Sequence, residues 1–159
     1  MADDLAKRYP QNTLVQSNYL PAILGQISIH AQNPADALDS QKQARLYELG
    51  QPAQAILLNL YPVFVRSQAY LATHDNQKAM AEFQKILEHP GMSLNEPIAV
   101  LARLEIARAY AANGQRERAR SAYQDVLTLW ETADPDIPVL KQARAEYAKL
   151  ESHPEAAGN

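Results

Sequence analysis

The sequence has no cysteine, and this absence excludes a disulfide framework, a thiol nucleophile and a zinc–thiolate site. Glycine is scarce, with 5 residues among 159, and β-branched residues are few. No apolar run approaches the about 20 residues that cross a bilayer, because the most apolar stretch, residues 55–65, is short and contains Asn59 and Pro62. The amino terminus carries Asp3 and Asp4 where a signal peptide needs basic and apolar segments. These features favour close-packed helices and predict a cytoplasmic protein with no membrane segment.

The net charge is small and negative. A formal charge of -3 gives the chain no general attraction to phosphates, so nucleic-acid binding by this segment is not expected. Hydrophobic residues make up 47% and charged residues 21%, which is typical of a folded domain and not of a disordered chain.

Motifs of catalysis and of metal or cofactor binding are also missing from the sequence. The four histidines are scattered, and no two of them stand one helical turn apart: His30, His74, His89 and His153. No glycine-rich phosphate loop, G-x-S-x-G or H-E-x-x-H motif occurs. The sequence therefore predicts no enzyme activity, no metal and no cofactor.

A helical-hairpin pattern occurs three times along the chain. Its clearest copy covers residues 66–87, a second covers 104–127, and a looser one covers 22–44. Repeats of this length are supersecondary units that bury their apolar faces by stacking on one another. The repetition thus predicts a stacked array, and such arrays mostly bind other molecules.

The copies align on a small residue in the second helix of each hairpin, and these anchors lie 42 and 40 residues apart: Ala37, Ala79 and Ala119. Twelve residues before each anchor the residue is again small: Gly25, Ser67 and Ala107. Nine residues before the anchor stand Ser28, Tyr70 and Tyr110, and four after it stand Gln41, Phe83 and Tyr123. Small residues at facing positions let two helices approach to about 8–10 Å.

This pattern resembles the tetratricopeptide repeat (TPR), although the spacing is longer than the usual repeat of about 34 residues. The resemblance implies an all-α fold, a right-handed stack of antiparallel hairpins with about seven helices in a single domain, 1–159. We expect the following parts: a helix remnant of an earlier repeat at 1–10, a degenerate repeat at 13–50, repeats at 53–89 and 95–132, and a capping helix at 136–151.

Local signals predict the helix boundaries. Thr13 and Gln16 have the spacing of a capping box, and Asn33-Pro34 starts a helix that we expect to reach Tyr47. We further predict a helix from 53 to 73 that is interrupted or kinked near Pro62. Asp75 or Asn76, and Asn95, are expected N-caps, and Asn113-Gly114 forms a tight turn.

Residues from His89 onward are similar to the TPR tails that follow the kinase or winged-helix domain of some large bacterial regulatory proteins. The chain has no kinase motif of its own. The resemblance therefore implies a non-catalytic, protein-binding part of a larger bacterial signalling protein.

In the TPR family the first helix of each hairpin lines a concave groove. Carried over by position, the expected partner-binding residues are Tyr19, Gln26, Tyr61, Phe64, Gln68, Leu71, Leu104 and Arg108. The clamp of Lys, Asn and Arg that holds a peptide carboxylate in some members is missing except for Arg108. Such a groove suits an apolar, extended peptide. Packing between repeats is an equally good explanation of the same residues.

Two further features leave alternatives open. Residues 56–65 are more apolar than a helix buried on one side requires. Either neighbouring helices cover this stretch on all sides, or part of the stretch forms a partner or self-association surface. The third copy contains five arginines: Arg103, Arg108, Arg116, Arg118 and Arg120. They form either a positive patch that binds an acidic partner or a solvated helix face. Self-association that brings attached domains together is therefore the alternative function.

Overall fold

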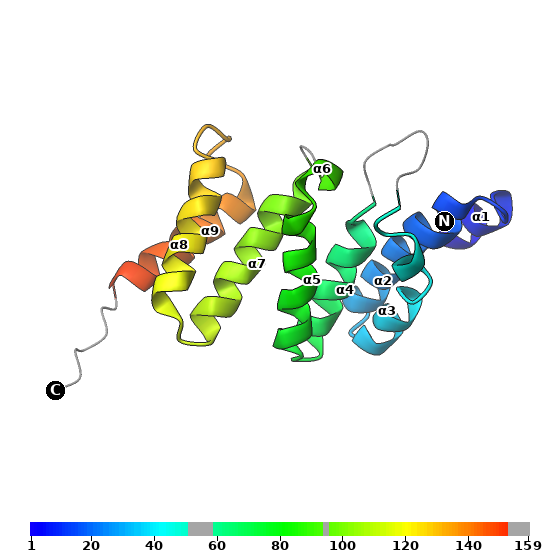
Figure 1. The fold of residues 1–159 in the computed structure, drawn as a ribbon, viewed down its shortest axis with the longest axis horizontal. Helices are drawn as coiled ribbons and strands as arrows, with labels where there is room; N and C mark the ends of the chain where they lie inside the picture. Colours follow the sequence, from blue (N-terminus) through cyan, green and yellow to red (C-terminus); the bar gives the residue numbers. More distant parts are fainter. Residues whose placement is uncertain (51–58, 94–95, 153–159) are drawn as a thin grey trace. The chain divides into compact units, whose positions relative to one another are not determined.

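The computed structural model describes residues 1–50, 59–93 and 96–152. Within these ranges the chain forms nine α-helices, a π-helical turn, a short 3-10 helix and no strand (Figure 1). The all-α fold class predicted from the sequence is confirmed.

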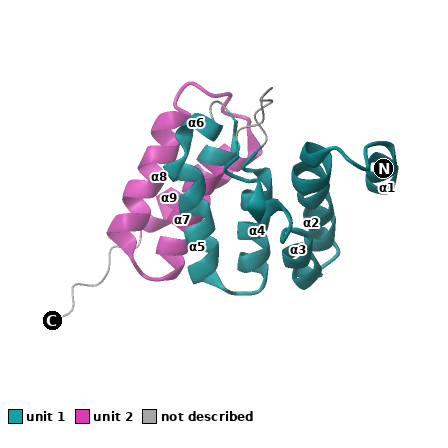
Figure 2. Ribbon diagram, turned by 45° about the vertical axis from the view of Figure 1, so that its right-hand side comes forward, with its two compact units in different colours: residues 1–99 teal, residues 100–159 magenta. Residues whose placement is uncertain are grey.

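The chain divides into two compact units, residues 1–99 and residues 100–159 (Figure 2). The first unit contains α1 (Ala2–Arg8), α2 (Leu20–His30), α3 (Pro34–Ser40), α4 (Tyr61–Ala72), α5 (Asn76–Glu88) and α6 (Pro90–Ser93). The second contains nearly all of α7 (Ile98–Ala112), together with α8 (Arg116–Leu129) and α9 (Pro138–Ser152). A single array of stacked repeats over residues 1–159 stays a prediction.

The three hairpin turns have the same backbone geometry. Gln32, His74 and Gly114 each adopt the left-handed conformation, with φ of 59°, 60° and 69°. In each turn the next residue donates its N–H to the carbonyl five residues back, and all three bonds measure 2.9 Å: Asn33 to Ser28, Asp75 to Tyr70 and Gln115 to Tyr110. This is the Schellman motif, which ends a helix and reverses the chain. The turns therefore repeat in register with the anchors identified in the sequence.

The small residues of the sequence pattern lie inside the hairpins. Ala37, Ala79 and Ala119 are 0% exposed, and their partners Gly25, Ser67 and Ala107 are buried as well. A Cβ atom at Gly25 would stand 2.3 Å from Gln41 Nε2 and 2.8 Å from Val65 Cγ1, so this crossing admits no larger residue without movement. The predicted role of small residues at the crossings is confirmed.

The position four residues after each anchor is also buried, in all three copies: Gln41, Phe83 and Tyr123. In the second unit Tyr123 packs with Leu104, Ala107, Val126 and Ala143, so α7, α8 and α9 share one core. Gln41 replaces the aromatic ring in the first copy, and its Nε2 donates to the carbonyl of Pro21 at 2.6 Å. The first copy therefore has a hydrogen bond where the other two have a ring.

The entry to the first hairpin differs from the prediction. Helical structure begins at Thr13, but Asn12 is the cap, because its Oδ1 accepts from Val15 N at 3.0 Å. Gln16 does not complete a capping box and instead donates to the carbonyl of Tyr9 at 2.9 Å. Residues Val15–Tyr19 then form a π-helical turn. Pro21 has no N–H for the carbonyl one turn back, and this favours the wider turn.

Three other boundaries also differ. Helix α3 ends at Ser40, well before Tyr47, and is followed by turns and a 3-10 helix at Ala44–Leu46. Of the two alternatives near Pro62, the described residues show no kink: α4 begins at Tyr61, and Pro62 stands in its first turn, where its missing N–H costs nothing. Helix α7 begins at Ile98, and the predicted cap Asn95 lies outside the described residues, as do residues 53–58 of the predicted helix.

Several other helix ends agree with the sequence. Asp75 caps α5 by accepting from Lys78 N at 3.2 Å, and α5 ends at Glu88 before His89. The Asn113-Gly114 turn and the final helix, α9, lie where they were expected.

Candidate functional site

The predicted groove residues divide between the two units. Six lie in the first unit and are all partly buried: Tyr19, Gln26, Tyr61, Phe64, Gln68 and Leu71. Phe64 packs edge-on against Phe83, with ring centroids 5.8 Å apart. Tyr61 donates its hydroxyl to Glu96 Oε2 at 2.9 Å, and burial, followed by this bond and the charge of Glu96, raises the pKa of Tyr61. These side chains thus make contacts within the unit.

The other two predicted residues lie in the second unit. Leu104 is 2% exposed and belongs to the core, so its side chain is not open to a ligand. Arg108 donates to both carboxylate oxygens of Glu146 at 2.9 Å and to Glu105 at 2.6 Å. Its charge is balanced by these two partners, and it is not a free clamp for a peptide carboxylate.

The arginines of the third copy are thus partly neutralised. Besides Arg108, Arg120 pairs with Glu151 at 2.8 Å. The structure therefore favours a solvated helix face over a dedicated acidic-partner surface.

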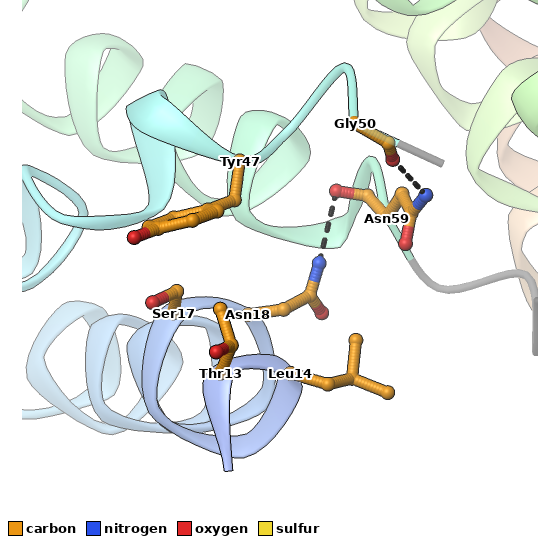
Figure 3. A pocket seen from close by; sticks show the side chains of 7 residues that line it. All are labelled: Thr13, Leu14, Ser17, Asn18, Tyr47, Gly50 and Asn59. Atoms are coloured by element: carbon orange, nitrogen blue, oxygen red, sulfur yellow. Dashed lines mark hydrogen bonds between the residues drawn. The ribbon is translucent and has the colours of Figure 1, made fainter. Parts of the chain in front are cut away.

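A pocket of about 240 Å³ lies in the first unit, outside the predicted groove set (Figure 3). One side is formed by the helical stretch that contains the π-turn, through Thr13, Leu14, Ser17 and Asn18. The other side is formed by Tyr47, Gly50 and Asn59. None of these seven residues carries a charge. The π-turn places Ser17 and Asn18 together at this wall, and such turns often occur at functional sites.

A short chain of amide hydrogen bonds runs along the pocket. Asn18 donates its Nδ2 to the carbonyl of Asn59 at 3.1 Å, and Asn59 donates its own Nδ2 to the carbonyl of Gly50 at 2.9 Å. Because a carbonyl only accepts, the nitrogen of the Asn18 amide must face Asn59 and the oxygen must face the other way. Figure 3 shows this oxygen turned to the side of Leu14.

The Asn18 amide oxygen has no hydrogen-bond partner in the described parts of the chain, although the residue is only 6% exposed. A buried acceptor without a partner costs about 1–3 kcal/mol. Asn18 therefore lines the pocket and also carries a buried acceptor that is unpaired among the described residues.

The segment that carries Tyr47 has apolar side chains in contact with solvent. Leu46 is 80% exposed, and Tyr47 and Leu49 are each 48% exposed. These three exposed side chains are called the apolar rim, and one of them, Tyr47, also lines the pocket. Exposed apolar clusters of this kind mark interaction sites.

A buried ion cluster holds the same segment in place. Arg66, which is 0% exposed, donates from one terminal nitrogen to Glu48 at 2.8 Å and to Glu82 at 2.6 Å. Lys85 contributes two more ion pairs, to Glu48 at 2.9 Å and to Glu82 at 3.1 Å. Glu48 follows Tyr47 directly, so the cluster attaches the pocket wall to α4 and α5.

The charges of the cluster determine the protonation of Glu82. Burial raises the pKa of this carboxyl, but the hydrogen bonds and charges of Arg66 and Lys85 outweigh burial and hold the pKa below its ordinary value. Two nitrogens of Arg66, Nε and Nη1, have no partner among the described residues. Glu82 is thus ionised at neutral pH, and Arg66 is incompletely hydrogen-bonded among the described residues.

Sequence reasoning did not find the pocket or the cluster. The one signal was Arg66, which interrupts the apolar run YPVFVRSQAYL. A charged residue among apolar helical positions indicates a buried ion pair, because charges are rarely buried unless they are paired. Asn18 gave no signal of its own, because its partner Asn59 is 41 residues away.

Within residues 1–50, 59–93 and 96–152, no group of three or more His, Asp or Glu side chains is arranged to hold a metal ion. No helix in those ranges is both long and apolar enough to cross a membrane. Comparison of the chain with protein-family models, with curated proteins and with solved structures found no match.

Proposed function

We propose that this chain is a non-catalytic, TPR-like interaction scaffold that binds a peptide or protein segment. The repeated Schellman turns and the buried small residues at equivalent positions support the repeat interpretation. A right-handed stack of the hairpins, and a parent protein of the bacterial regulatory type, are parts of this proposal.

The observation that carries the proposal is the pocket beside an exposed apolar rim. The rim, formed by Leu46, Tyr47 and Leu49, offers apolar area to a partner. Tyr47 of this rim also lines the pocket of about 240 Å³. Protein interfaces gain most of their affinity from a few side chains that enter such pockets.

Binding at this site requires little rearrangement. The Arg66 cluster holds the segment that carries Tyr47, and the Asn18–Asn59 bond joins the two sides of the pocket. A preformed site loses less conformational entropy when it binds, so a modest contact area is sufficient. The half-buried Tyr61, Gln68 and Leu71 remain proposed contacts of the same segment.

Selection from a random peptide display library tests the proposal. We expect enrichment of peptides that share a motif and bind the chain with micromolar Kd. Thr13→Phe should weaken their binding at least tenfold, because Thr13 is an exposed pocket residue whose enlargement fills the entrance. Thr128→Phe, the same change at an exposed position of α8, is the matched control. Failure to enrich any peptide, or equal binding by the two variants, contradicts the proposal.

Self-association is the second candidate, and one observation favours it. Leu24 and Ile27 of α2 are 40% and 56% exposed, whereas Arg66 and Ala69, which occupy the equivalent positions 42 residues later, are 0% exposed. The face that is covered in the second copy is open in the first. We expect sedimentation velocity to show a mass that rises with concentration, and Ile27→Lys to abolish this rise. A strict monomer at high concentration contradicts self-association.

A further inference from the structure

A second cleft lies in the first unit, between α3 and α4. Helices α3 and α4 pack against each other within this unit (Figure 2). The cleft has a volume of about 460 Å³ and is lined by residues of α3, of the segment that follows it and of α4: Ala35, Leu38, Asp39, Lys42, Arg45 and Tyr70. Ligand sites in proteins have volumes of roughly 300–1,000 Å³. The cleft therefore has room for more than one side chain of a bound segment.

Two hydrogen-bond donors stand side by side at one end of the cleft. Arg45 donates from Nη2 to the hydroxyl oxygen of Tyr70 at 2.8 Å. Because this oxygen accepts from Arg45, the hydroxyl proton of Tyr70 remains for another acceptor, and the described residues supply none. The side chain of Arg45 is 50% exposed, and its other described partner, Glu82, is 3.9 Å away. A ligand with two acceptor oxygens can bind the guanidinium and the hydroxyl together.

The buried ion cluster extends to Arg45 and has an excess of one positive charge. Three cations, Arg45, Arg66 and Lys85, face only two carboxylates, Glu48 and Glu82. Arg66 lies between the two carboxylates in the interior, and Lys85 also contacts both of them. Arg45 is the most exposed of the three cations, so the excess charge is located at the cleft.

The other charged groups at the cleft are arranged in pairs. Lys42 pairs with Asp39. Lys78 lies over the ring of Tyr70, 5.6 Å from its centroid, and pairs with Asp75 at 2.6 Å. Each of these pairs has no net charge. The cleft therefore keeps the positive charge that the ion cluster leaves over.

Charge and surface chemistry together indicate the class of ligand. Leu38 is half-buried and supplies apolar surface beside the donors, and Ala35 extends this surface. A polyanion such as a nucleic acid is disfavoured, because the whole chain has a net charge of -3 and Asp39 stands in the cleft wall. A single carboxylate has one negative charge and two acceptor oxygens, which matches both the excess charge and the pair of donors.

We propose that the α3–α4 cleft is a docking site for an acidic peptide segment. One glutamate or aspartate carboxylate of the segment accepts from Arg45 and from the Tyr70 hydroxyl, and a neighbouring apolar side chain lies against Leu38. This site goes beyond the proposed function, because the cleft shares no lining residue with the pocket of Figure 3. It also uses no residue of the groove predicted from the sequence.

Titration of the full chain with two capped dipeptides tests the proposal. The probes are acetyl-Leu-Glu-amide and acetyl-Leu-Gln-amide, which have nearly the same shape and differ in the charge of one side chain. We expect the acidic probe to bind with a Kd on the order of a millimolar, as is typical of a small fragment. The neutral probe should bind about fivefold more weakly. Heteronuclear NMR should place the shifts at the backbone amides of Leu38, Arg45 and Tyr70, and added salt should weaken binding of the acidic probe.

Variants of the chain provide the second comparison. Arg45→Gln should lower the affinity for the acidic probe to that for the neutral probe. Tyr70→Phe keeps the ring but removes the hydroxyl, so it should weaken binding by a smaller factor. Arg144→Gln, the same change at an exposed position of α9, is the matched control and should leave binding unchanged. If Arg45→Gln does not fold, as judged by circular dichroism, the probe pair and Tyr70→Phe still decide the result.

Three results would overturn the proposal: equal binding of the two probes by the native chain, equal losses in Arg45→Gln and Arg144→Gln, or tighter binding of inorganic phosphate than of the acidic probe. These results are distinct from failure of the proposed function. Library peptides that are blocked by Thr13→Phe, together with equal binding of the two probes, would support the pocket and reject the cleft. Binding of the acidic probe that depends on Arg45, without any peptide blocked by Thr13→Phe, would support the cleft and reject the pocket.

Discussion

Arg66→Ala is expected to lower the free energy of unfolding by about 3–5 kcal/mol. Arg66 is fully buried between Glu48 and Glu82, which are 5% and 9% exposed. Its removal leaves two carboxylates in a poorly solvated site with Lys85 as their nearest cation. Urea unfolding followed by circular dichroism measures the loss.

A surface ion pair provides the control for this experiment. Arg120 pairs with Glu151, and both side chains are almost half exposed. Arg120→Ala should therefore lower stability far less than Arg66→Ala does, because exposed ion pairs contribute little. Equal effects of Arg66→Ala and Arg120→Ala would contradict the assignment of the cluster as a buried, stabilising network.

The Arg66 cluster also makes the stability of the chain depend on pH. Glu82 has a lowered pKa in the folded chain, so its contribution is complete above the ordinary Glu range near 4.3 and is lost as the pH falls through the lower folded pKa. The free energy of unfolding of the native chain should therefore decrease as the pH is lowered from neutral through this range. Glu82→Gln should reduce this decrease. If the unfolding free energy of the variant depends on pH as strongly as that of the native chain, Glu82 does not contribute.

Phe83→Ala is expected to cost about 3–5 kcal/mol. Phe83 is 1% exposed and packs against Phe64 across the second hairpin. Alanine at this position removes the ring from the core of the first unit and leaves a cavity beside α4. The loss should appear in urea unfolding and as faster hydrogen exchange of the amides of α5.

The matched control is an apolar residue on another helix surface. Leu129 is 54% exposed, so Leu129→Ala should cost less than about 0.5 kcal/mol. A small effect of Phe83→Ala would show that α4 and α5 are held together by other contacts. The repeat interpretation of Phe83 as a gap-filling ring would then be wrong.

The local and periodic features of this fold could be predicted from the sequence. Asp75 caps α5 through its own side chain, and Gly114 readily adopts the left-handed turn, so each acts within a few residues. The anchors Ala37, Ala79 and Ala119 recur at nearly constant spacing, and small residues are required wherever two helices cross closely. Sequence patterns report such short-range and repeated requirements well.

The candidate site depends on contacts between residues far apart in the chain. Asn18 meets Asn59 across 41 residues, and Arg66 lies between Glu48 and Glu82, 18 and 16 residues away. No local propensity specifies which amide or carboxylate a side chain will reach. The sequence by itself thus determined an all-helical chain with three similar hairpins. Only the tertiary structure decided that a buried arginine would hold Tyr47 in place and that one amide oxygen would remain unpaired, because both depend on how distant segments pack together.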